Sequence, residues 1–82
     1  MDVVLVEWLD AAASSGWRPR GEEPPEPVTC YTVGHLLKHV EGAYISLVMS
    51  VNLNEMADIT TIPESAIISV TPLAARQPLA DV

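Results

Sequence analysis

The sequence is a succession of short, β-branched apolar segments that are separated by turn-forming residues. In the segment 44–51 the odd-numbered positions are Ile, Leu, Met and Val, and polar side chains occupy most even-numbered positions. This period of two is the pattern of a strand with one buried face. The same pattern places Val4, Val6 and Trp8 on one face of a strand at 3–8. These segments predict an all-β fold.

Turn signals divide the apolar segments into five predicted strands. Glu41-Gly42 forms a tight turn, the asparagines within 52–55 form another, and Pro63 begins a single 3₁₀ turn. The predicted strands are 3–8, 28–40, 44–51, 58–62 and 67–71, with the 3₁₀ turn at 63–66.

The region 33–42 has a second interpretation. Four of its apolar residues have helical spacing, and Gly42 suits a helix C-cap. A strand is preferred because 28–33 is β-branched, Gly34 permits a sharp bend, and a strand before the turn at 41–42 forms a hairpin with 44–51.

A long loop and a tail complete the single predicted domain, 1–82. The segment 14–27 holds three glutamates, four prolines and two glycines, which predicts an extended loop without regular structure. The tail 74–82 has no hydrophobic period and is predicted to be peripheral.

Composition bears on partners and on cellular location. A chain of 82 residues with one cysteine has no internal disulfide to stabilise it, yet 49% of its residues are hydrophobic. This excess predicts a homo-oligomer. The net charge of −7 disfavours general nucleic-acid binding, because such binding depends on Lys and Arg. The sequence contains no signal peptide or bilayer-spanning run, so we expect a cytoplasmic protein that does not contact membranes.

Five short strands with a 3₁₀ turn before the last are typical of a small Sm- or SH3-like barrel. The segments 40–51 and 56–72 resemble the bacterial Sm-like RNA chaperones of the Hfq type. That resemblance implies a five-stranded barrel and, as one possible role, an RNA-chaperone-like or structural ring. Glu64 and Ser65 stand where this family has its RNA-contacting Lys-His pair, and an acid there argues against RNA binding.

A second resemblance covers most of the chain. Its residues are Val6-Glu7-Trp8, Asp10-Ala11, Ser14-Ser15-Gly16-Trp17, Thr32-Val33-Gly34, and Ile62-Pro63 with Ala66-Ile67. These resemble a group of small bacteriophage and prophage proteins. The resemblance implies a non-enzymatic accessory or counter-defence role in the host cell, in which the protein binds a host protein or sequesters a small nucleotide signal.

Catalytic and metal sites are not expected. Cys30 lies in an apolar strand, and no motif pairs it, Ser14 or Ser15 with a base. His35 and His39 are four residues apart, which on a strand separates them by about 13 Å, too far to share one ion. We therefore predict neither enzymatic activity nor a metal or cofactor.

The stretch that holds both tryptophans is the candidate site. Trp8 is in phase with the buried face of the first strand, whereas Trp17 follows a small-residue turn. Trp17 either packs over an open end of the core or stacks on a flat, nucleotide-like ligand. In the second case the predicted ligand-binding residues are Asp10, Ser14, Ser15, Gly16, Trp17, Arg18, Arg20 and Tyr31.

Three functions are compatible with this sequence, and the third is the RNA-chaperone-like or structural ring named above. In the first, an oligomeric protein sequesters a small nucleotide-like ligand through the Trp17 segment. In the second, an acidic protein–protein interaction module inhibits a basic host protein by mimicking nucleic acid.

Overall fold

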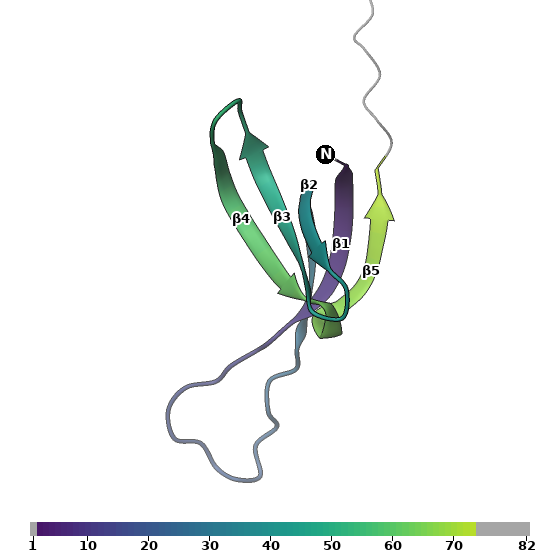
Figure 1. The fold of residues 1–82 in the computed structure, drawn as a ribbon. Coiled ribbons are helices and arrows are strands. Elements are labelled where there is room, and N and C mark those ends of the chain that lie inside the picture. The colour runs from purple at the N-terminus through teal and green to yellow at the C-terminus, as the bar shows by residue number, and fades with distance from the viewer. Residues whose placement is uncertain (1, 74–82) are drawn as a thin grey trace, which may run out of the picture.

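The structure, a computed structural model, describes residues 2–73 and forms one antiparallel sheet of five strands. The strands are β1 (Val3–Asp10), β2 (Val28–Val40), β3 (Tyr44–Val51), β4 (Met56–Pro63) and β5 (Ile67–Pro72), with a 3₁₀ turn, η1 (Glu64–Ala66), before β5 (Figure 1). The predicted all-β fold, the five strands and the 3₁₀ turn are confirmed. The predicted tail, 74–82, lies outside the described residues.

The sheet is bent but does not close into a barrel, which corrects the expectation of a closed structure. Its strand order is β4-β3-β2-β1-β5, so β4 and β5 are the two edges and do not pair with each other. β4 ends at η1 and β5 begins there, and the two strands diverge from this point because β5 runs along β1 whereas β4 runs along β3 (Figure 1). A single chain therefore leaves two strand edges open.

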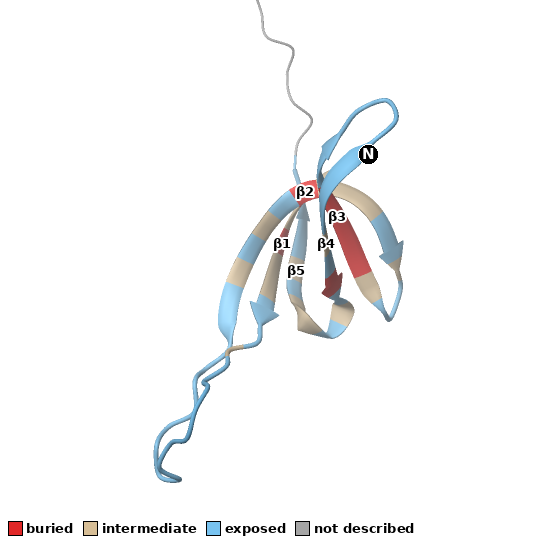
Figure 2. Cartoon of the chain, turned by 90° about the vertical axis from the view of Figure 1, so that its left-hand side faces the viewer, coloured by how far each residue is buried: buried red, intermediate tan, exposed pale blue. Residues whose placement is uncertain are grey.

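The long strand β2 joins the two halves of the sheet. Its residues 28–35 pair with β1 and its residues 35–40 pair with β3, so the strand changes partner at His35. Gly34 is buried next to this change, and a Cβ there would lie 3.2 Å from both Leu47 Cβ and the Val48 carbonyl oxygen. Figure 2 shows β2 arching over, with a buried segment at the top of the arch. The predicted bend is confirmed, and the helical interpretation of 33–42 is wrong.

The turn between β2 and β3 is hydrogen-bonded to the 3₁₀ turn. Gly42 has a φ of +77°, a conformation that glycine adopts without steric cost. The Gly42 N–H donates to the Glu64 carboxylate at 2.7 Å, and the Glu64 N–H donates to the Ala43 carbonyl oxygen at 2.9 Å. Glu64 thus connects the β2–β3 turn to η1.

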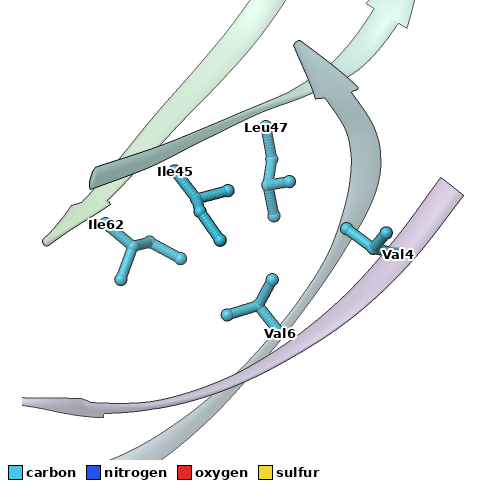
Figure 3. Packing of buried hydrophobic residues seen from close by; sticks show 5 residues of the cluster. All are labelled: Val4, Val6, Ile45, Leu47 and Ile62. Atoms are coloured by element: carbon cyan, nitrogen blue, oxygen red, sulfur yellow. The ribbon is translucent and has the colours of Figure 1, made fainter. Parts of the chain in front are cut away.

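The hydrophobic core is small. Its buried cluster has five members, which point toward one another from β1, β3 and β4: Val4, Val6, Ile45, Leu47 and Ile62 (Figure 3). Trp8 packs against this cluster and its indole N–H donates to Thr32 Oγ1 at 3.0 Å, which confirms the predicted buried face of β1.

The predicted buried face of β3 is correct only for its first half. Ile45 and Leu47 are buried, but Met49 and Val51 are exposed. The reason lies in the pairing: the last β2–β3 pair is His35↔Val48, and beyond it β3 has only β4 beside it.

Candidate functional site

The loop of residues 11–27 connects β1 to β2 and extends away from the sheet (Figure 1). β1 ends at Asp10, two residues beyond the predicted strand, and the loop includes residues 11–13 in addition to the predicted 14–27. Every residue of the loop except Ala12 is exposed, and Figure 2 shows the whole loop as an exposed segment. Side chains in this loop are therefore available to a partner, as its charged and proline-rich composition would suggest.

Local contacts give the loop a definite conformation. The Asp10 carboxylate accepts the Ala11 N–H at 2.8 Å where β1 ends, and Gly16 adopts a φ of +87°. The Glu22 N–H donates to the Pro19 carbonyl oxygen at 3.1 Å, which closes a turn at the tip. Arg18 reaches across this turn, and its Nη1 lies 2.8 Å from Glu22 Oε1.

A hollow of about 370 Å³ lies between the two limbs of the loop. Three of the predicted ligand-binding residues, Ser14, Gly16 and Arg18, line it. The opposite limb supplies residues that the sequence prediction did not include: Glu22, Glu23, Pro24 and Pro25. No signal in the sequence identified these residues, because a loop without periodicity does not indicate which of its side chains face each other.

Trp17 lies outside the hollow and its side chain is free of the chain's own fold. It is 104% exposed, whereas Trp8 is partly buried against the core. The packing interpretation of Trp17 is wrong for the single chain, because the loop carries this residue away from the open side of the core. The two tryptophans of the segment 8–17 thus have different environments.

The remaining predicted residues do not join the hollow. Ser15 and Arg20 belong to the same loop but are not among its lining residues. Tyr31 lies on β2, opposite Glu7 of β1, and its side chain is exposed. The Asp10 carboxylate is occupied by the Ala11 N–H at the end of β1.

The charges around the hollow do not favour an anionic ligand. Arg18 is the one cation among its lining residues, and it is paired with Glu22. Glu23 adds a second carboxylate to the same hollow. A phosphate placed there would meet more negative than positive charge, and the pairing of Arg18 would have to be broken first.

The other chemically active side chains are dispersed. Cys30 is a half-buried free thiol, and its Sγ lies 3.8 Å from the Val28 carbonyl oxygen. His39 Nε2 lies 3.4 Å from Glu64 Oε2 at the surface. Among residues 2–73, no group of three or more His, Cys, Asp and Glu side chains is arranged to hold a metal ion.

Comparison with protein-family models, with curated protein sequences and with solved structures finds no match to this chain. In the part of the chain that the structure describes, no helix has the length and apolar character needed to cross a membrane.

Proposed function

We propose that this protein is a non-catalytic binding module and that the loop of residues 11–27 contacts its partner, with Trp17 as the anchor. The observation that supports this proposal is the complete exposure of Trp17 on a loop that has internal contacts of its own. Burying an indole of roughly 200 Å² would contribute about 5 kcal/mol at 25 cal/mol per Å². Tryptophan is also among the residues most enriched at the energetic centres of protein interfaces.

The charge of the chain supports a basic protein as the partner. The chain has eleven acidic and four basic residues, and Glu22, Glu23 and Glu26 lie in the loop itself. An apolar pocket with a rim of Lys and Arg would accept Trp17 and would be steered toward the acidic chain. The resemblance to small phage and prophage proteins supports a counter-defence setting, in which the module inhibits a basic protein of the host cytoplasm.

A small nucleotide-like ligand is the second candidate. The support for it is the hollow of about 370 Å³, which is lined by Ser14, Gly16 and Arg18. These three residues are close neighbours of Trp17 in the sequence. That volume lies in the range of small-molecule sites. Because Arg18 is already paired with Glu22, we favour a protein partner over a nucleotide-like ligand.

An Sm- or SH3-like relationship and self-association belong to the same proposal. The five antiparallel strands and the 3₁₀ turn before β5 support the relationship. The five-residue core cluster and the unpaired edges of β4 and β5 support association with further copies, because exposed edges are templates for pairing.

Native mass spectrometry of protein purified from expressing bacterial cells tests the proposed function. We expect a protein to co-purify with the wild type and to be lost with Trp17→Ala. Tyr31→Ala, which removes an exposed aromatic residue outside the loop, should retain it. A bound small molecule in place of the protein would favour the second candidate, and a partner that survives Trp17→Ala would contradict the role of the loop.

A further inference from the structure

The end of the β3–β4 hairpin, residues 49–59, forms an arm that leaves the sheet. Beyond the pair His35↔Val48 the arm is not paired with β2, and its strands pair only with each other, as in Val51↔Met56. All residues from 49 to 59 are exposed. Figure 1 shows the hairpin end projecting beyond the part of β3 that lies beside β2. Among residues 2–73 this arm therefore lacks a packing partner, although a two-stranded ribbon by itself is only marginally stable in water.

The arm is apolar despite its exposure. Met49, Val51 and Met56 share one face of the ribbon, because Val51 is opposite Met56 and Met49 lies two residues before Val51. The same face carries Ile45 and Leu47 further down β3, where it forms the core. The apolar face of the core thus continues onto the arm, where Met49 is 55% and Met56 is 52% exposed.

The tip of the arm is an ordered turn. The Asn52 side-chain oxygen accepts the N–H groups of Asn54 and Glu55 at 3.0 and 2.8 Å, and the Asn52 N–H donates to the Glu55 carbonyl oxygen at 2.9 Å. These bonds hold Leu53 at the tip, where it is 95% exposed. Because the backbone on both sides of Leu53 is already ordered, burying this residue costs little backbone freedom, which favours binding.

The arm also carries a recess that suits this side chain. A hollow of about 260 Å³ beside the tip is lined by Val51, Asn52, Asn54, Glu55 and Met56. Each copy of the chain therefore presents both a projecting leucine and an apolar recess on one surface. Self-complementarity of this kind is what a two-fold interface requires, since each contact then occurs twice.

We propose that two copies of this chain associate through their arms, with Leu53 of each copy seated against Val51 and Met56 of the other. The proposal rests on the self-association proposed above and assigns it to a surface. The arm carries two acids, Glu55 and Asp58, and no base, so the contact depends on its apolar side chains. The two-fold contact buries the face that the single chain leaves open.

Sedimentation equilibrium of the full chain, over the micromolar range, tests the arm. Leu53→Asn removes the projecting side chain from a position that packs on nothing in its own chain, so folding should be unchanged. We expect this change to weaken association about tenfold or more. The control, Val28→Asn, alters an exposed apolar residue outside the arm and should leave association within about threefold of the wild type.

The outcomes separate the two proposals. A wild-type chain that stays monomeric overturns both self-association and the arm contact. An oligomer that Leu53→Asn does not weaken overturns the arm contact alone. A second measurement uses two variants, Leu53→Cys and Met56→Cys, each also carrying Cys30→Ser. When the two are mixed, they should form a disulfide-linked dimer. Failure to cross-link would contradict the arm contact.

Discussion

Replacement of Gly34 by alanine tests the account of how β2 spans the two halves of the sheet. The added Cβ would lie 3.2 Å from Leu47 Cβ and 3.2 Å from the Val48 carbonyl oxygen. Ordinary carbon contacts are about 3.5–4.0 Å. Neither neighbour is the free end of a flexible side chain, because one is backbone and the other is the Cβ of a buried leucine. The strands must therefore separate by a few tenths of an ångström to accept the methyl group.

Overpacking of this kind costs about 1–3 kcal/mol. The lower conformational entropy of alanine in the unfolded chain offsets about 0.4–1 kcal/mol of that cost. We expect Gly34→Ala to lower the free energy of unfolding by about 0–2.6 kcal/mol, measured by urea denaturation followed by circular dichroism.

Two glycines provide matched controls for this substitution. A Cβ at Gly21 would meet nothing within 4 Å, so Gly21→Ala should leave stability unchanged or raise it slightly. Gly42 also has open space but a φ of +77°, so Gly42→Ala should cost about 1 kcal/mol through backbone strain alone. A Gly34→Ala protein as stable as the Gly21→Ala protein would refute the close approach of β2 and β3.

Substitutions at four further positions have defined expectations in the same denaturation assay. Asp58 has a φ of +62°, so Asp58→Gly should raise the unfolding free energy by about 1 kcal/mol, whereas Asp58→Ala should not. Glu64→Ala removes the acceptor of the Gly42 N–H and should cost about 1 kcal/mol, with a smaller loss for Glu64→Gln, which keeps an oxygen; equal losses would contradict the hydrogen bond. Trp8→Phe, which removes the donor to Thr32, should cost about 1–2 kcal/mol. Leu47→Ala should cost about 3–5 kcal/mol, much of the total stability of a chain this size.

The strands were predictable because their signals are local. The alternation in 44–51 gave the bounds of β3 as observed, and Gly34 marked the part of β2 at which the strand changes partner. Whether the sheet closes into a barrel was not predictable from such local signals, because the pairing of β4 with β5 depends on how strongly the whole sheet twists and bends. The same limit explains why Met49 and Val51 were wrongly predicted to be buried. Their exposure depends on where the pairing of β2 with β3 ends and not on their own spacing.

The candidate site was predictable in part. The small-residue turn before Trp17 correctly indicated an exposed loop whose Ser14, Gly16 and Arg18 lie around one hollow. The glutamates of the opposite limb were missed, because a loop without periodicity gives no sign of which residues face each other. Tyr31 was included for its chemistry alone, and its strand position places it on the outer side of the β1–β2 pair, beside Glu7.

The central claim is that Trp17 stands free of its own fold and is available to a partner, whereas Trp8 belongs to the core. Fluorine NMR of protein labelled with 5-fluorotryptophan tests this claim directly, with Trp17→Phe to assign the two resonances. In the free protein the Trp17 resonance should show the full solvent isotope shift between H₂O and D₂O, and the Trp8 resonance should show a small one. A Trp17 resonance as protected from solvent as that of Trp8 would contradict the account.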